Sequence, residues 1–283
     1  MDNAQQQLIW LYLDNLQVQV TEMGHKQVWP DWRDLDYTPD YNKFYLICDG
    51  EGWLKIGDKE YAPKPGQLFL MPQGVKQSYS YTDGPRFTKY WCHFTAKVGE
   101  NNLFNLLKVP VFLESGLEGE PKRLFRELLS CQSGTSLTAP LLVKAAMMKL
   151  IAYYVEHAAT DVAGVEPAAV SKPLQAVIEY IHLNYYRNLT IDELAERAHL
   201  HPNYFIRVFK RHFGTSPIQY VNRKRIEEVK WLLTSTNLLL AEIGANVGIP
   251  DISYLSKLFK SSTGLSPIAY RLAHHPAPPL NHR

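Results

Sequence analysis

The sequence predicts an α+β protein of two domains: a β-barrel followed by helices, and then an all-α unit that contains two helix-turn-helix motifs. Two observations support this prediction. Short strand-like segments fill the first hundred residues, and a helical pattern occurs twice in the last hundred. The length of 283 residues suits two ordinary domains. A composition that is 46% hydrophobic and 20% charged is typical of globular proteins.

Residues 8 to about 98 are expected to form strands. Segments such as FYLICDGEG, WLKIGDKEY and FTKYWCHF are separated by Gly, Asp and Pro. Short strands at roughly 8–12-residue spacing with turn residues between them are typical of an antiparallel barrel or sandwich. We therefore place a β-barrel over residues 1–110.

Residues 111–158 change to a helical pattern. PKRLFRELLSCQ (121–132) and PLLVKAAMMKLIAYYVEH (140–157) both open with Pro, which suits the first turn of a helix. The second segment is apolar on nearly every side, which predicts a helix that packs on the barrel and can also meet a partner subunit. The small and Pro-containing residues 159–173 are expected to be a linker.

Several protein classes are disfavoured by the sequence. The three cysteines, Cys48, Cys92 and Cys131, lie far apart, which suits reduced thiols in the cytoplasm. The polar start does not resemble a signal peptide, and no apolar run approaches the ~18–20 residues of a membrane span. No P-loop, dinucleotide fingerprint or Gly-x-Ser-x-Gly is present. We expect a cytoplasmic protein that is not an enzyme and needs no cofactor.

The C-terminal region contains an internal repeat. YFIRVFKRHFGTSPIQY (204–220) and YLSKLFKSSTGLSPIAY (254–270) share eight of 17 positions. A repeat of this kind predicts one structural unit used twice. Each copy is expected to form helix, turn and helix, with Gly214 and Gly264 as C-terminal caps. Thr190 and Glu193 have the spacing of a capping box at the start of the first unit.

The second helix of each unit is expected to have a polar outer face. A basic face on one helix usually only meets solvent, but two matching motifs joined by a helix favour insertion into the major groove of DNA. Residues 174–275 carry twelve Lys and Arg against eight acids, a modest signal in the same direction. The outer faces comprise Asn203, Ile206, Arg207 and Lys210, then Ser253, Ser256, Lys257 and Lys260. The connecting helix begins with Arg223, Lys224 and Arg225, which are expected to contact phosphate.

From about Leu174 to Arg271 the sequence resembles the AraC/XylS family of bacterial transcription regulators. The resemblance rests on Leu-Ala-x-x-Ala at 194–198, Tyr-Phe-x-x-x-Phe-Lys at 204–210 and Gly-x-Ser-Pro at 214–217 and 264–267. It implies a double helix-turn-helix domain over 174–273, with a disordered tail at 274–283. The base-facing positions that it implies are Asn203, Ile206, Arg207, Ile252, Ser253, Ser256 and Lys257.

This chain departs from the family pattern at several positions. His199 stands where the first turn usually has Gly, Gly244 where the second unit usually has Ala, and Ile249 replaces a usual Phe. Ile206 and Ile252 replace residues that are often polar. Isoleucine offers no hydrogen bond to a base edge but can contact a thymine methyl group.

The N-terminal region resembles a cupin-like sensing domain, through Gly50-Glu51-Gly52, GQLFLMPQGVKQSY (66–79) and YWCHF (90–94). Enzymatic cupins bind a metal through several His and a Glu, but Gln77 occupies the position of the last His and the preceding stretch has no His. No metal site is therefore expected. His93 is expected to be a structural or pocket residue.

A barrel of this size can hold one small ligand. By resemblance to arabinose-sensing relatives, Tyr79 and Trp91 would line the pocket, although such rings are equally at home in a barrel core. Polar partners for a ligand are less clear, with Arg33, Arg86 and Lys43 as the candidates. A carbohydrate is the first expectation for the effector, with an aromatic acid or a signal peptide as alternatives.

The function expected from these features is a ligand-responsive transcription regulator, most simply an activator. Its expected partners are double-stranded DNA, a small effector, RNA polymerase and a second copy of the chain. One alternative is a DNA-binding regulator whose barrel only dimerises. A second alternative, a metal-dependent cupin enzyme, requires a metal site that the sequence lacks.

Overall fold

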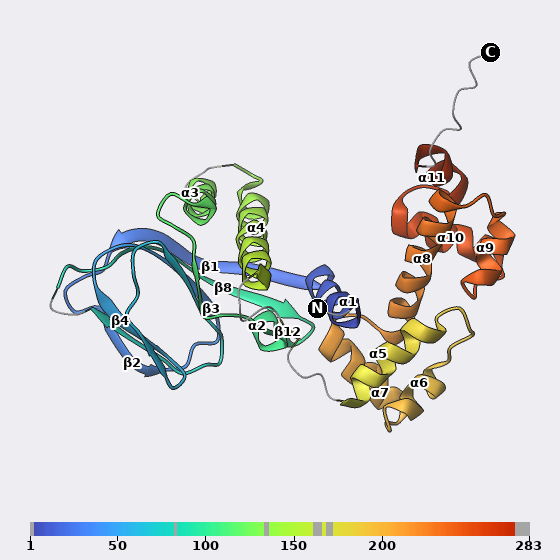
Figure 1. The fold of residues 1–283 in the computed structure, drawn as a ribbon, viewed down its shortest axis with the longest axis horizontal. Helices are drawn as coiled ribbons and strands as arrows, with labels where there is room; N and C mark the ends of the chain where they lie inside the picture. Colours follow the sequence, from blue (N-terminus) through green and yellow to red (C-terminus); the bar gives the residue numbers. More distant parts are fainter. Residues whose placement is uncertain (1–2, 82–83, 133–135, 161–165, 168–171, 275–283) are drawn as a thin grey trace, which may run out of the picture. The chain divides into compact units, whose positions relative to one another are not determined.

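A computed structural model describes residues 3–81, 84–132, 136–160, 166–167 and 172–274. The chain divides into two compact units, Met1–Ala169 and Val170–Arg283, which run from blue to green and from yellow to red in Figure 1. Among the described residues, no helix is long and apolar enough to span a membrane.

The N-terminal unit contains two antiparallel sheets that enclose one core. The larger sheet consists of β1 (Leu16–Gln27), β8 (Thr88–Val98), β3 (Asn42–Asp49), β6 (Gln67–Met71) and β11 (Phe112–Glu114) in that order, with β9 (Asn101–Asn102) beside β8. The smaller sheet has the order β2 (Arg33–Tyr37), β7 (Gln77–Tyr81), β4 (Gly52–Ile56) and β5 (Lys59–Tyr61). The predicted barrel is thus built from two sheets that share one core.

Strand alternation gives β3 and β8 two different faces, because successive side chains point to opposite sides of a sheet. Tyr45 pairs with Trp91, and Lys43 pairs with His93. Tyr45 and Trp91 belong to the core between the sheets, which also contains Trp32, Ile47, Leu54, Ile56, Phe69, Met71, Tyr79 and Phe87. Lys43 and His93 therefore lie on the inner face of the larger sheet.

The outer face of the larger sheet is covered by helices α2 (Leu103–Leu106), α3 (Glu120–Gln132) and α4 (Ala139–Thr160). Phe44 packs on Tyr154 of α4, with ring centroids 5.0 Å apart. Tyr90 stacks on Phe125 of α3 at 5.6 Å. The two helical segments predicted between 111 and 158 are confirmed.

The prediction that α4 packs on the barrel is confirmed for one side of the helix. One stripe of the helix is buried, including Met147, Leu150 and Tyr154. Leu141 and Leu142, near its start, are 68% and 48% exposed. The sheet covers one side of a helix, so the remaining apolar side chains of α4 stay on the surface.

The prediction that strands begin at residue 8 is wrong, because helix α1 covers Asn3–Asp14. Its buried side chains are Leu8, Ile9, Leu11 and Tyr12. That spacing follows one face of a helix and not the alternation of a strand. The first strand begins at Leu16.

The region expected to be a linker is only partly described. α4 continues to Thr160, and β12 (Glu166–Pro167) pairs with β10 (Leu107–Lys108). Helix α5 (Lys172–Asn184) begins before the predicted end of the linker. Residues 161–165 and 168–171, and the predicted tail from 275 onward, lie outside the described residues.

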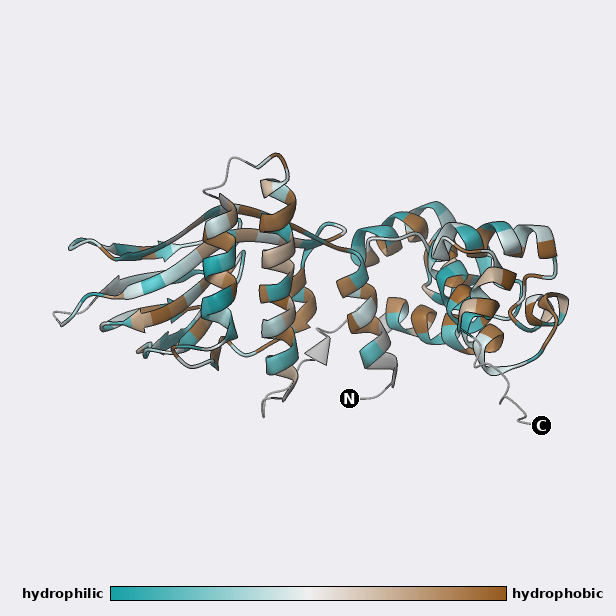
Figure 2. Cartoon of the chain, turned by 90° about the horizontal axis from the view of Figure 1, so that it is seen from above, coloured by the Kyte–Doolittle hydropathy of each residue, from teal (hydrophilic) through white to brown (hydrophobic). Residues whose placement is uncertain are grey.

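The C-terminal unit is helical throughout its described length. Its helices after α5 are α6 (Ile191–Arg197), α7 (Pro202–Phe213), α8 (Pro217–Ser235), α9 (Leu240–Asn246), α10 (Ile252–Thr263) and α11 (Pro267–His274). Brown apolar and teal polar residues alternate along these helices in Figure 2. α6–α7 and α9–α10 form the two predicted helix-turn-helix motifs, and α8 connects them.

Candidate nucleic-acid interface and barrel interior

Helices α7 and α10 have matching C-terminal ends because the repeat carries a glycine at the same position of each unit. Gly214 and Gly264 end the two helices with φ of 74° and 77°. This left-handed conformation is readily adopted by glycine, so the predicted C-terminal caps are confirmed. At the other end, Asp251 accepts hydrogen bonds from the N–H groups of Ser253 and Tyr254.

Each of these helices is anchored by a buried aromatic stripe. Phe205, Phe209 and Phe213 of α7 are fully buried, as is Phe259 of α10. With the apolar side of each helix fixed, the opposite side faces solvent. The predicted base-facing and phosphate-facing residues that are exposed are Asn203, Arg207, Lys210, Ile252, Ser253, Lys257 and Lys260, while Ile206 and Ser256 are half-buried.

The basic residues 223–225 lie within α8, which begins at Pro217, and Arg223 and Arg225 do not share one role. The guanidinium of Arg225 donates from Nε to the carbonyl oxygen of Tyr185 at 2.7 Å, and from Nη2 to that of Arg187 at 2.6 Å. Arg223 instead lies 5.8 Å from the ring centroid of Tyr220. Arg225 therefore holds the turn after α5, and its donors are directed into the protein.

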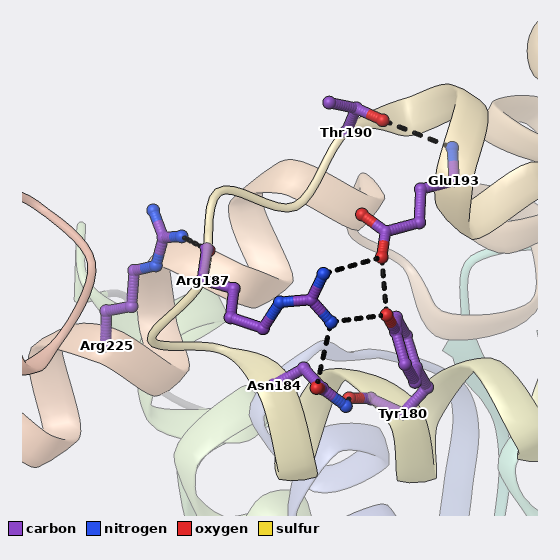
Figure 3. Close-up of polar contacts among 6 residues, drawn as sticks. All are labelled: Tyr180, Asn184, Arg187, Thr190, Glu193 and Arg225. Carbon is purple, nitrogen blue, oxygen red and sulfur yellow. Dashed lines mark hydrogen bonds and ion pairs between the residues drawn. The ribbon is translucent and has the colours of Figure 1, made fainter.

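The predicted capping box at α6 forms only in part (Figure 3). Thr190 accepts from the N–H of Glu193 at 3.2 Å. The Glu193 carboxylate does not return to Thr190, because it accepts a hydrogen bond from the Tyr180 hydroxyl and lies 3.9 Å from Arg187 Nη2. The carboxylate thus joins α6 to α5.

The two motifs are also joined to each other. Asn222 of α8 donates to the Tyr254 hydroxyl of α10 at 3.3 Å. In the turn of the second motif, Gly248 packs so closely that a Cβ there would lie 2.3 Å from the Tyr186 carbonyl oxygen. Arg271 of α11 donates to the carbonyl oxygens of Leu233 and Leu238. These contacts attach the second motif to α8 and to the turn after α5.

Two departures from the family pattern have a visible structural setting. His199 adopts φ of +54° in the first turn, where Gly248 has +75° in the second. At Gly244, a Cβ would lie 2.5 Å from the Ile249 carbonyl oxygen. The second turn therefore has no room for the alanine usual at that position.

The barrel interior brings together Tyr79, Trp91, His93 and Lys43 from the predicted ligand residues. Tyr79 stacks on Trp32 with centroids 4.4 Å apart, and its hydroxyl lies 3.4 Å from Asp34 Oδ2. Trp91 and His93 lie side by side on β8, 4.8 Å between centroids. Arg33 is exposed on β2, away from the buried part of this cluster.

The residues compared above with a cupin metal site are arranged differently here. Gln77 is fully buried; its Nε2 donates to the Pro72 carbonyl oxygen at 2.9 Å, while its Oε1 has no hydrogen-bond partner. His93 Nδ1 lies 3.5 Å from Glu22 Oε2. Within the described part of the chain, no group of three or more His, Cys, Asp or Glu is placed to bind a metal ion.

Comparison with protein families matches both units of the chain. The helix-turn-helix domain family matches residues 194–273, and the AraC-like ligand binding domain family matches residues 38–151. The chain belongs to the AraC family of transcriptional regulators. It is a DNA-binding regulator of that family, and the predicted two-domain fold is confirmed.

Relatives of this AraC-family protein align over both units. The HTH-type transcriptional regulator YisR of Bacillus subtilis is 28% identical over 82% of this chain and 86% of its own length. The lactose operon transcription activator of Staphylococcus xylosus is 22% identical over 82% and 83%. The arabinose operon regulatory protein of Escherichia coli is 23% identical over 80% and 78%.

The barrel of this regulator contains a pair of buried lysines, of which only Lys43 was a candidate from the sequence. Lys43 of β3 and Lys89 of β8 are 1% and 4% exposed. Desolvation lowers the pKa of Lys43 from 10.5 to about 8. Burial, together with the charges of Lys43 and Lys26, lowers the pKa of Lys89. The same burial and both lysine charges lower the pKa of His93 to about 3. The only sequence signal for the burial of Lys89 was its position two residues before Trp91, which places both side chains on the same face of the strand.

Proposed function

We propose that this AraC-family regulator activates transcription by reading a promoter through α7 and α10, in response to a small ligand held between the sheets of its N-terminal unit. The observation that carries this proposal is the pair of matching recognition helices, fixed in one helical frame, each with a basic outer face. A ligand acts by shifting the population of the DNA-binding arrangement.

In the proposed complex, the two recognition helices enter the major groove. Arg207 and Lys257 lie at corresponding positions of the two helices, both exposed. Either side chain suits the O6 and N7 acceptors of guanine. Ile206 and Ile252 would contact thymine methyl groups, while Lys210, Lys260 and Arg223 would contact phosphates.

The effector is proposed to be a carbohydrate. Two relatives are named as regulators of lactose and arabinose operons. Tyr79, Trp91 and Trp32 supply ring faces of the kind that stack on the C–H faces of sugars, and Tyr79 and Trp91 are half-buried. A ring that is partly exposed at the edge of a core can cover a ligand.

Two macromolecular partners complete the proposal. The exposed Leu141 and Leu142 of α4 support a homodimer formed through this helix, because apolar side chains gathered on a surface favour association. As an activator, the DNA-bound protein would contact RNA polymerase.

Promoter binding tests the proposal directly. Fragments upstream of neighbouring genes are titrated with the full chain at two salt concentrations, with competitor DNA, in the presence and absence of a panel of sugars. We expect one fragment to bind at least a hundred-fold more tightly than competitor, and one sugar to change that affinity. Equal and equally salt-sensitive binding to every fragment, with and without each sugar, would contradict the proposed function.

A further inference from the structure

We propose that the ligand of the barrel carries a negative charge, a carboxylate or phosphate group bound by the ammonium groups of Lys43 and Lys89. This inference rests on the proposed function, since it names the chemical class of the effector for that site. A carbohydrate of this class is an acidic sugar or a sugar phosphate.

The first argument is the absence of a counter-ion. Within the described part of the chain, no carboxylate oxygen lies within 4.0 Å of either ammonium nitrogen. Asp34 is the acid whose negative charge acts on the pKa of Lys43. Its Oδ2 atom lies 3.4 Å from the Tyr79 hydroxyl. Glu22 faces His93 instead. A buried charge is costly unless it is paired, and here the charge of Lys43 also disfavours the charged form of Lys89.

The second argument is that aromatic faces surround both ammonium groups without neutralising them. Lys89 Nζ lies 3.2 Å from the ring centroid of Tyr45 and 4.1 Å from that of Trp32. Lys43 Nζ lies about equally far from two rings, 5.1 Å from Tyr37 and 5.0 Å from Tyr79. Cation–π contacts position the lysines and offset part of their desolvation, but a ring face supplies no carboxylate or phosphate to pair with an ammonium group.

The third argument is that the surrounding groups suit an organic anion. Tyr37, Tyr41, Tyr79 and Trp91 are half-buried, so the cluster extends from the lysines toward the surface. Trp32 and Tyr79 offer ring faces to an apolar or sugar ring, while the lysines offer donors to an acidic group. Neutral sugars would leave both charges uncompensated.

Thermal unfolding of the full chain tests this inference. The probes are galacturonate and glucuronate, their neutral counterparts galactose and glucose, and glucose 6-phosphate, all at matched ionic strength. We expect an acidic probe to raise the melting temperature with at least ten-fold tighter apparent binding than its neutral counterpart. The carboxylate and phosphate arms show which acidic group the site prefers.

The variants Lys43→Met and Lys89→Met should lose at least ten-fold in apparent affinity for the acidic probe. Both should melt higher than the wild type without ligand, because an unpaired buried charge has been removed. Lys89→Gln replaces Lys89→Met where the latter gives no cooperative transition. The matched control is Lys55→Met on β4, whose ammonium lies 3.9 Å from Glu60 at the surface.

Equal binding of neutral and acidic probes, unchanged affinity in both lysine variants, or no shift with any acid would each overturn the inference. A neutral sugar that stabilises all variants equally would overturn it and leave the proposed function intact. Promoter-specific binding is measured separately, in the titration with promoter fragments, and its loss would count against the proposed function itself.

Discussion

Arg225 Nε lies 2.7 Å from the carbonyl oxygen of Tyr185, so a residue of α8 secures the turn between α5 and α6. The second guanidinium bond, to the Arg187 carbonyl oxygen at 2.6 Å, fixes the same turn from its other side (Figure 3). The first helix-turn-helix motif is thereby attached to the helix that leads to the second.

Replacing Arg225 with Met should lower the stability of the C-terminal unit by about 2 kcal/mol, because two charge-assisted hydrogen bonds are lost. The salt dependence of DNA binding should stay unchanged, since the guanidinium donates to carbonyl oxygens within the protein. Chemical denaturation and salt titrations measure the two effects. Arg223→Ala is the comparison; it should lower the salt slope by about 1 with little loss of stability. The reverse assignment of effects would show that Arg225 contacts phosphate.

Arg207→Ala and Lys257→Ala should each weaken binding to the specific promoter by about 1–3 kcal/mol, because each removes a donor from a recognition helix. Fluorescence anisotropy with specific and random duplexes measures the loss. Lys230→Ala, a change on α8 outside both recognition helices, serves as the control for a lost charge. An equal loss on random DNA would assign these residues to phosphate contacts.

His199→Gly should raise the stability of the C-terminal unit by about 0.5–1 kcal/mol. A non-glycine residue at φ of +54° is strained. The strain that glycine removes from the folded state exceeds the stability lost because glycine makes the unfolded chain more flexible. The opposite change at the matching position of the other motif, Gly248→Ala, should lower the stability by more than about 2 kcal/mol. Its φ is +75°, and the added Cβ would meet the Tyr186 carbonyl oxygen. Denaturation midpoints compare the pair; a destabilised His199→Gly variant would point to a role for the imidazole.

The stability gained by Lys43→Met in the unliganded protein should depend on pH. The pKa of Lys43 falls from 10.5 to about 8 on folding, so below pH 8 the lysine is charged in both states and its burial is costly. Between pH 8 and 10.5 the folded state loses the proton first, and the penalty, on the order of 3 kcal/mol, fades. Lys89, His93 and Asp34 face the same site in the wild type and in the Lys43→Met variant. A constant stability difference across this window would contradict the assignment.

Changing Leu141 and Leu142 together to Asp should convert a dimer into a monomer without lowering the melting temperature of the fold, since both side chains are exposed. Analytical ultracentrifugation over a concentration series measures the change. Leu183→Asp is the control, because Leu183 is 72% exposed on α5 of the other unit. A dimer that survives the double change would place the interface elsewhere.

The two helix-turn-helix motifs were predictable from the sequence because helix periodicity and caps act over three or four residues. Gly214 and Gly264 adopt the left-handed caps that their positions in the repeat indicated, and the Phe stripe of α7 is buried as its spacing required. The Thr190 cap was also readable. The orientation of the Glu193 side chain could not be predicted, because its partners Tyr180 and Arg187 lie outside α6.

The tertiary structure alone decided two other features. β3 packs on the core with one face and on helices with the other, so its apolar segment FYLIC does not reveal which alternate residues point inward, and the burial of Lys43 could not be read. The direction of Arg225 depended on the carbonyl groups of Tyr185 and Arg187, which are 40 and 38 residues away in the chain. A sequence determines what each helix or strand prefers locally, whereas the partner of a long side chain is settled when the elements pack.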